Sequence, residues 1–138
     1  MVDSLWVPDR RDMIWIDFNP QAGDKEMKDH HPMMVLSSKV FSERTGLVIG
    51  LPMTSAPSNA KNTMAISFVH KTETKYILAY LPKSFDFRKR KASPHPWGKV
   101  PQEAFDEARG LLEQIITLST CKSLMSLRVT TRFTMVVM

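Results

Sequence analysis

Two short apolar segments with a polar loop between them constrain the fold of this chain more than any other feature. Residues 13–18 read Met-Ile-Trp-Ile-Asp-Phe, and residues 33–37 read Met-Met-Val-Leu-Ser. Both are rich in strand-forming side chains, and Asn-Pro and Ala-Gly turn signals follow the first, so each segment predicts a strand of a β-sheet. The first alternates between two faces, whereas the second is apolar on both, as expected for a central strand of a small barrel.

The rest of the sequence predicts further short strands and one long helix. Residues 47–53 form a strand pattern interrupted by Gly50 and Pro52, which indicates a bulge or a close approach of two backbones. Phe105, Ala108 and Leu112 recur at helical spacing after a proline. The other expected elements are a helical turn at 38–43, strands at 63–69, 76–81 and 83–88, a basic and proline-rich connector at 88–98, and the helix at 101–118. Together they predict a mainly β fold with some α (α+β), a small SH3-like β-barrel with a C-terminal amphipathic helix.

The chain divides into one domain and a tail. With 138 residues in all, it is long enough for a single domain with a real core, which we assign to residues 1–118. Residues 119–138 contain no acidic residue, glycine or proline, and residues 129–137 have strong strand propensity. This tail is either a loosely attached segment or a strand that pairs with an exposed sheet edge.

Composition predicts a cytoplasmic protein without a disulfide, a cofactor or a metal. No apolar run approaches the length of a membrane span, and the acidic N-terminus lacks the pattern of a secretory signal. Cys121 is the single cysteine, and no set of histidines and carboxylates has a metal-ligand spacing. The net charge of +5 suggests a nucleic-acid partner, but residues 1–118 hold all 14 acidic and 16 of the 19 basic residues, so the positive charge is local.

The loop between the first two strands carries most of the reactive side chains. It offers Asp24, Glu26, Asp29, His30 and His31 within eight positions. Loops held between rigid strands commonly carry binding and catalytic groups. We therefore expect the functional site to be built around this loop.

Several short motifs occur in an order that resembles the MazF/PemK family of toxin endoribonucleases. They are Val7-Pro8-Asp9, Asp12-x-Ile14-Trp15-x-Asp17-Phe18-x-Pro20, a loop with Gly23, His30-x-Pro32-x-x-Val35-Leu36-Ser37, Thr45-Gly46 and Pro52-x-Thr54. More weakly, the resemblance continues through Lys83-Ser84-x-Asp86-x-Arg88 to the helix after Pro101. It implies the CcdB/PemK-like toxin fold, with its small barrel and C-terminal helix, over roughly residues 5 to 118.

The resemblance also implies an activity, that of the toxin of a type II toxin–antitoxin system. Such toxins cleave single-stranded RNA, mRNA included, at chosen sequences and without a metal. The ribose 2′-hydroxyl attacks the adjacent phosphorus and leaves a 2′,3′-cyclic phosphate and a 5′-hydroxyl end. This chemistry needs a base, an acid, and donors or cations for the charge on the phosphoryl oxygens.

Three residues match catalytic positions of the family. Glu26 matches the loop glutamate, Thr54 matches the threonine that holds the scissile phosphate, and His31 stands where the family carries its catalytic arginine. Each also has a structural interpretation: Glu26 as a solvated loop carboxylate, Thr54 as an ordinary strand-end residue, and His31 as a polar loop residue.

The chain departs from the family at three places. Histidine offers at best a fraction of a charge at pH 7, whereas arginine grips phosphate permanently through two bonds, so His31 is the most informative departure. Where relatives carry Asp-Gln, this chain has Tyr80-Leu81, and Tyr80 is either a barrel residue or a side chain that stacks on a base. Arg11 replaces the usual glycine before Asp12.

Further residues are candidates for binding RNA. They are His30, Ser55, Lys83, Arg88 and Arg90, and the basic run at 88–91 would contact phosphates in a salt-dependent manner. Trp97, which follows this run, is either part of the RNA surface or a residue of the core or of an interface.

The resemblance implies a cognate antitoxin and a homodimer as partners. The alternative function is a weakened or inactive relative that binds RNA or an antitoxin peptide. A third possibility, a DNA-gyrase poison, arises because the CcdB toxin shares the fold, but the helix here continues as Ile115-Ile116-Thr117-Leu118 and lacks the Trp-Gly-Ile ending through which that toxin acts.

Overall fold

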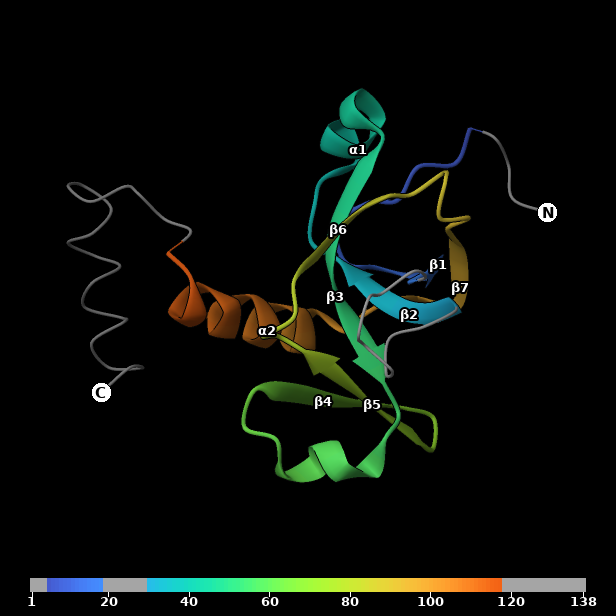
Figure 1. The fold of residues 1–138 in the computed structure, drawn as a ribbon. Coiled ribbons are helices and arrows are strands. Elements are labelled where there is room, and N and C mark those ends of the chain that lie inside the picture. The colour runs from blue at the N-terminus through green and yellow to red at the C-terminus, as the bar shows by residue number, and fades with distance from the viewer. Residues whose placement is uncertain (1–4, 19–29, 118–138) are drawn as a thin grey trace.

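A computed structural model of the chain describes residues 5–18 and 30–117. Within these ranges the chain forms a seven-stranded sheet, two α-helices and a short 3-10 helix (Figure 1). The elements are β1 (Asp12–Asp17), β2 (His30–Val35), α1 (Lys39–Thr45), β3 (Leu47–Thr54), the 3-10 helix η1 (Pro57–Lys61), β4 (Ala65–His70), β5 (Glu73–Leu78), β6 (Lys83–Asp86), β7 (Ser93–Lys99) and α2 (Gln102–Ile115).

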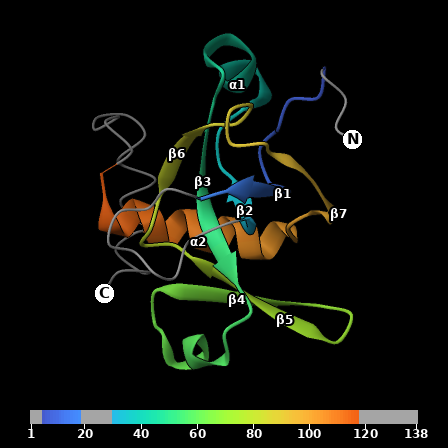
Figure 2. The same cartoon turned by 45° about the vertical axis from the view of Figure 1, so that its right-hand side comes forward.

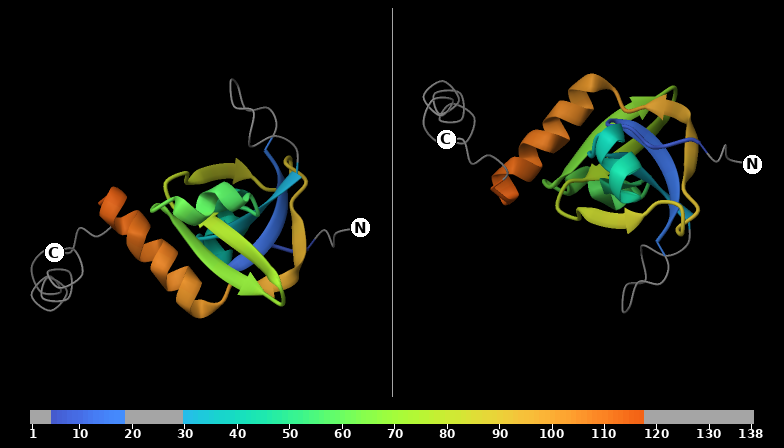
Figure 3. Two further views of the ribbon diagram at one scale, coloured as in Figure 1. Left: turned by 90° about the horizontal axis from the view of Figure 1, so that it is seen from below. Right: turned by 90° about the horizontal axis from the view of Figure 1, so that it is seen from above.

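The strands form one curled antiparallel sheet in the order β4-β5-β3-β2-β1-β7, with β6 paired to β3. Viewed from below and from above, the strands curl around a core and α2 lies along one flank (Figure 3). The β4–β5 hairpin extends below the rest of the sheet, and α1 lies at the opposite end from η1 (Figures 1 and 2). The expected small barrel with a C-terminal helix is thus confirmed as a half-barrel.

The core is built from both faces of β2, as the sequence predicted. Met33, Met34 and Val35 have no exposed surface, because β2 lies between β1 and β3 and each of its faces contacts a different apolar cluster. On one side, α2 contributes four of its residues to the cluster around Met34. They are Ala104, Phe105, Ala108 and Leu112.

Gly50 marks the close approach that its position in an apolar strand predicted. A Cβ atom at Gly50 would lie 2.3 Å from the backbone oxygen of Met34 and 2.6 Å from Cε of Met33. Pro52 continues the same strand and pairs with Met33, so β3 runs unbroken to Thr54. Of the two expected explanations for Gly50, the close approach of β2 and β3 is correct.

The lead-in and α1 fix the upper end of the sheet. Ser38 caps α1 by accepting a hydrogen bond from the backbone N–H of Phe41 at 3.2 Å. The Asp9 carboxylate accepts from the backbone N–H of Arg10 at 2.7 Å and of Lys39 at 3.0 Å. These bonds, the Arg10 bond first, lower the pKa of Asp9.

Three expectations about element positions were wrong. Residues 93–99, expected as part of a connector, form β7, which pairs with β1 through Ser93 and Pro94. Proline is tolerated there because β7 is an edge strand of the sheet order. His30 and His31, expected in the loop, belong to β2 and pair with Asp17 and Ile16 of β1.

The third correction concerns the strand expected at 76–81. β5 begins earlier, at Glu73, and ends at Leu78, after which the Leu81 N–H donates to the Leu78 carbonyl at 3.2 Å. This turn closes the strand early and puts Tyr80 outside the sheet. The expected helix at 101–118 is confirmed over Gln102–Ile115.

Arg11 adopts the left-handed backbone conformation with φ of 77°, which explains why a glycine suits this position. Its backbone is held on both sides, since its N–H donates to Val35 and its carbonyl accepts from Val100. The side chain bonds Gln102 at the start of α2. None of the helices in the described ranges is long and apolar enough to cross a membrane. Glu26 and the 119–138 tail lie outside the described residues, so the interpretations of both stay predictions.

Candidate functional site

A cavity of about 420 Å³ lies where the start of β2, the end of β3, η1 and the turn after β5 meet. It is lined by His31 of β2, Thr54 of β3, and Tyr80 of the turn, together with η1 residues that include Asn59. The fold thus brings together two of the predicted catalytic residues, His31 and Thr54, and a second departure from the family, Tyr80. Among the described residues that line this cavity, none is a lysine or an arginine.

Thr54 lies at the end of β3, and its hydroxyl hydrogen has no partner among the described residues. Its backbone pairs with Tyr76 of β5, and its Oγ1 accepts a hydrogen bond from the Ala56 N–H at 3.1 Å. A hydroxyl has one hydrogen to donate besides its acceptor lone pairs. Within the described ranges no partner takes that hydrogen, so Thr54 can donate it to an acceptor in the cavity.

His31 is half-buried at the start of β2. Its ring lies edge-on to Phe18, with the centroids 5.7 Å apart, and Phe18 is fully buried. This contact limits the ring's freedom, while its nitrogens have no hydrogen-bond partner in the described part of the chain. His30 next to it is exposed, and its Nε2 lies 3.4 Å from the Lys91 carbonyl.

Two asparagines near the cavity were missed by the sequence analysis, which assigned residues 57–62 only as a polar turn. Asn62 donates from Nδ2 to the Asn59 Oδ1 at 3.1 Å and to the Tyr80 hydroxyl at 3.4 Å. Asn59 itself lines the cavity. The only signal was that Pro57 opens a helical turn, which fixes the direction of the side chains that follow.

The predicted RNA-binding residues are not among the described residues that line this cavity. Lys83 is in β6, and Ser55 is exposed directly after Thr54. Arg88 donates to the Trp6 carbonyl at 3.2 Å, and Arg90 donates to the Asp17 carbonyl at 3.3 Å. The last two guanidinium groups also lie over the rings of Phe87 and Phe85, respectively.

Comparison with known sequences identifies the family. The profile described as PemK-like, MazF-like toxin of type II toxin-antitoxin system matches residues 9–116. The chain belongs to this family. The match covers every element from β1 to α2, so the cavity described above lies within the family's toxin domain.

The relatives agree with this membership. The endoribonuclease toxin MazF of Escherichia coli (strain K12) is 40% identical over 52 residues, which are 38% of this chain and 46% of that protein. This chain thus matches less than half the length of that relative. A crystal structure of MazF from Deinococcus radiodurans has a TM-score of 0.72 at 29% identity and covers 82% of this chain and 99% of its own. A MazE–MazF structure from the same organism shares the fold, with a TM-score of 0.66 at 24% identity over 83% of this chain and 99% of that one.

In this PemK/MazF-family chain, Trp97 belongs to an aromatic cluster packed against the core. Its ring stacks on His70 at 4.1 Å and meets His95 edge-on at 5.2 Å, while His95 stacks on Trp15 at 4.8 Å. Burial lowers the pKa of His95, and the positive charges of Lys75 and His70 act in the same direction. The interpretation of Trp97 as a packing residue is confirmed.

No group of three or more metal-ligating side chains occurs in residues 5–18 and 30–117. The cavity itself has one imidazole and no carboxylate among its described lining residues. The described side chains that line it therefore offer a ligand hydroxyl, amide and imidazole groups.

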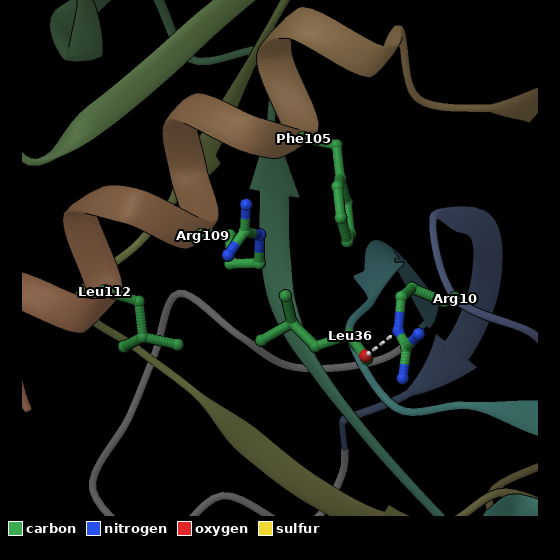
Figure 4. A pocket seen from close by; sticks show the side chains of 5 residues that line it. All are labelled: Arg10, Leu36, Phe105, Arg109 and Leu112. Atoms are coloured by element: carbon green, nitrogen blue, oxygen red, sulfur yellow. Dashed lines mark hydrogen bonds between the residues drawn. The ribbon is translucent and has the colours of Figure 1, made fainter. Parts of the chain in front are cut away.

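A second hollow, of about 400 Å³, lies between α2 and the end of β2. Figure 4 shows Phe105, Arg109 and Leu112 of α2 facing Leu36, whose carbonyl accepts from Nε of Arg10 at 3.2 Å. Arg109 also pairs with Glu113 at 3.0 Å. This hollow is mostly apolar and is separate from the cavity that holds His31 and Thr54.

Proposed function

We propose that this toxin-family chain is a metal-independent, sequence-specific endoribonuclease that cleaves single-stranded RNA, including mRNA. One observation carries the proposal. His31 and Thr54, which come from different strands, line one cavity, and the Thr54 hydroxyl retains a hydrogen to donate. The name of the curated relative, an endoribonuclease toxin, supports the same activity.

The reaction needs two proton transfers and stabilisation of a phosphoryl oxygen. The 2′-oxygen forms a bond to phosphorus while the bond from phosphorus to the 5′-oxygen breaks, which leaves a 2′,3′-cyclic phosphate and a 5′-hydroxyl. We propose that the Thr54 hydroxyl donates a hydrogen bond to the phosphoryl oxygen. This hydroxyl already accepts a hydrogen bond from the Ala56 N–H. A carboxylate at neutral pH is ready to accept a proton, so we assign Glu26 as the base and His31 as the acid for the leaving oxygen.

The RNA would enter over the rim of the cavity. His30 and Ser55, both exposed and next to the catalytic candidates, suit contacts to the neighbouring nucleotides. We propose that Lys83, Arg88 and Arg90 act on the RNA mainly through their charge, since the guanidinium groups of both arginines already bond backbone carbonyls.

We further propose that a cognate antitoxin and a second copy of the chain are its protein partners, and that it acts in the cytoplasm. The Deinococcus relatives crystallised as MazE–MazF share this fold, which makes the same type of partner the natural candidate. Size-exclusion chromatography with light scattering tests the homodimer, because a monomeric mass at micromolar concentration would refute it.

The alternative is a weakened relative that binds RNA or an antitoxin peptide without cutting. The observation in its favour is that His31 replaces the arginine of the family and that the described cavity lining contains no permanent cation. Losing one such donor typically reduces a rate about a hundred- to a thousandfold.

The test is incubation of the full chain with a long mixed-sequence RNA in EDTA, with mapping of the fragment ends. Thr54→Val keeps a similar shape but removes the hydroxyl, whereas Thr54→Ser keeps the hydroxyl. We expect discrete cuts with 5′-hydroxyl ends, slowed about a hundred- to a thousandfold in Thr54→Val and less than about tenfold in Thr54→Ser. Intact RNA at high enzyme concentration would refute the endoribonuclease and favour the binding alternative, and cuts abolished by EDTA would refute the metal-independent mechanism.

A further inference from the structure

The Tyr80 hydroxyl belongs to a hydrogen-bond network at the cavity. A backbone N–H in this network determines which groups donate and which accept. The side chain is 41% exposed in the turn after β5, and its hydroxyl lies 3.4 Å from Nδ2 of Asn62. Tyr80 and Asn59 both line the cavity, and the side-chain amide of Asn62 bonds both of them.

The orientation of the Asn62 amide is fixed by the main chain. The Met64 N–H can only donate, and it lies 2.9 Å from the Asn62 oxygen Oδ1. The other end of the amide is therefore the NH₂ group. Its two hydrogens have two partners, the Asn59 oxygen and the Tyr80 hydroxyl.

The Tyr80 hydroxyl must then accept from Asn62, which leaves its own hydrogen free. In the described part of the chain no other group bonds this hydroxyl. Its hydrogen is thus available to the cavity, as the hydrogen of Thr54 is, and both hydroxyls act as donors there. An acceptor on a ligand that meets Tyr80 can therefore receive this hydrogen.

We propose that Tyr80 is a specificity-determining residue that selects RNA bases with a carbonyl group on the exposed edge, and that Asn62 is its positioning residue. The inference rests on the proposed function, because it takes RNA as the ligand of this cavity. Unpaired bases present their edges to protein groups. At C4 of a pyrimidine or C6 of a purine, uracil and guanine carry a carbonyl oxygen, whereas cytosine and adenine carry an amino group, so a hydroxyl donor that meets this position favours the first two.

The experiment uses a random-sequence single-stranded RNA pool. At each position near the cut it measures the ratio of uracil and guanine, the carbonyl bases, to cytosine and adenine, the amino bases. Tyr80→Phe keeps the ring and removes only the hydroxyl. We expect this variant to lose the base preference at one position, by about three- to tenfold, which is the contribution of one hydrogen bond.

Asn62→Asp provides the matched reversal. The carboxylate still accepts from Met64, but it offers an acceptor to Tyr80 where the amide offered a donor, and it loses the bond to the Asn59 oxygen. The tyrosine hydroxyl then donates to Asp and turns its lone pairs to the cavity, so the preference at the same position should shift towards amino bases. The added charge lowers RNA affinity uniformly, and the ratio is unaffected by a uniform change.

The outcomes separate this inference from the proposed function. If the wild-type chain cuts RNA but Tyr80→Phe leaves every base ratio unchanged, the role of Tyr80 is refuted and the nuclease stands. If the wild type does not cut, the same ratio is measured in the RNA fraction retained by the protein, where a preference lost in Tyr80→Phe still supports the inference. A retained pool without such a preference, or no retention at all, refutes it. Equal melting temperatures of the three proteins exclude misfolding as the cause of a change.

Discussion

Replacing Gly50 by alanine should strongly destabilise the chain, because the added Cβ has no room between β2 and β3. It would lie 2.3 Å from the Met34 oxygen, whereas ordinary contacts begin at 3.4 Å, so the two strands have to separate by about 1 Å. Cε of Met33, at 2.6 Å, belongs to a flexible side chain and can move aside. The Met34 oxygen cannot, since it is part of the backbone of a central strand.

The loss of unfolding free energy depends on whether backbone or a side-chain tip has to move. Extra carbon atoms in a packed core typically cost about 1–3 kcal/mol, and the value here should reach about 3 kcal/mol because backbone rather than a side-chain tip has to shift. Gly110 is the matched control, since the same Cβ there meets nothing within 4 Å and lies in the interior of α2. Alanine at Gly110 should stabilise by about 1 kcal/mol through its helix propensity.

Urea unfolding followed by circular dichroism measures both variants. We expect the free energies of unfolding of Gly50→Ala and Gly110→Ala to differ by about 4 kcal/mol and to lie on opposite sides of the wild-type value. If Gly50→Ala stays within about 0.5 kcal/mol of the wild type, the close approach of β2 and β3 does not constrain this position and the reasoning fails.

Three other substitutions test the site and its support. His31→Arg should lower the ribonuclease rate about a hundredfold or more, because arginine keeps its proton at neutral pH and cannot act as the acid, while His30→Arg, which adds the same charge one residue away, should not. A raised rate in His31→Arg would mean that this position serves as a phosphate-binding cation, as the arginine of the family does, and would refute the assignment of His31 as the acid. The lowered pKa of His95 means that His95 takes up a proton near pH 6.5 in the unfolded chain but only at lower pH in the folded chain. The stability that neutral His95 contributes is therefore present above pH 6.5 and is lost as the pH falls through its lowered folded pKa. His95→Gln should therefore flatten the decrease in unfolding free energy between about pH 7 and pH 5, and an unchanged slope would contradict this assignment. Arg11→Gly should be about 1 kcal/mol more stable than Arg11→Ala, since both lose the bond to Gln102 and only glycine tolerates a φ of 77° without cost; equal melting temperatures would argue against backbone strain there.

The sequence predicted those parts of the fold in which local pattern and tertiary environment agree. The apolar run at 33–35 becomes the central strand, because only a strand covered on both faces can bury consecutive large side chains. Gly50 signalled a close approach because glycine in a strand interior is otherwise unfavourable. Neither inference required knowledge of distant residues.

β7 was missed because two prolines obscured a regular alternation. Pro94 and Pro96 are exposed, while His95 and Trp97 between and after them point inward, so the two-residue period of a strand is present. Propensity alone argues against a strand here, and only the free edge of β1 makes one possible. That edge is a property of the whole sheet and cannot be read from residues 93–99.

For the candidate site, the resemblance supplied His31 and Thr54, while Asn59 and Asn62 were missed for a physical reason. In a polar turn an asparagine usually serves the local backbone, and Asn62 does accept from Met64 two residues on. Its second function depends on Tyr80, 18 residues away in sequence. A contact of that range becomes visible only when β4 and β5 are paired.

The two hydroxyls of the cavity follow one rule. Each oxygen already accepts a hydrogen bond, Thr54 from the Ala56 backbone and Tyr80 from Asn62, so each is left as a donor to whatever enters. At Thr54, such a fixed donor stabilises developing negative charge on the phosphoryl oxygen without having to reorient during the reaction. Because Thr54 is anchored by a backbone N–H and Tyr80 by a side chain, substitution can reverse the direction of Tyr80 but not that of Thr54. Catalysis and base choice in this cavity should therefore be separable, with Thr54 variants changing the rate and Asn62 variants changing the sequence that is cut.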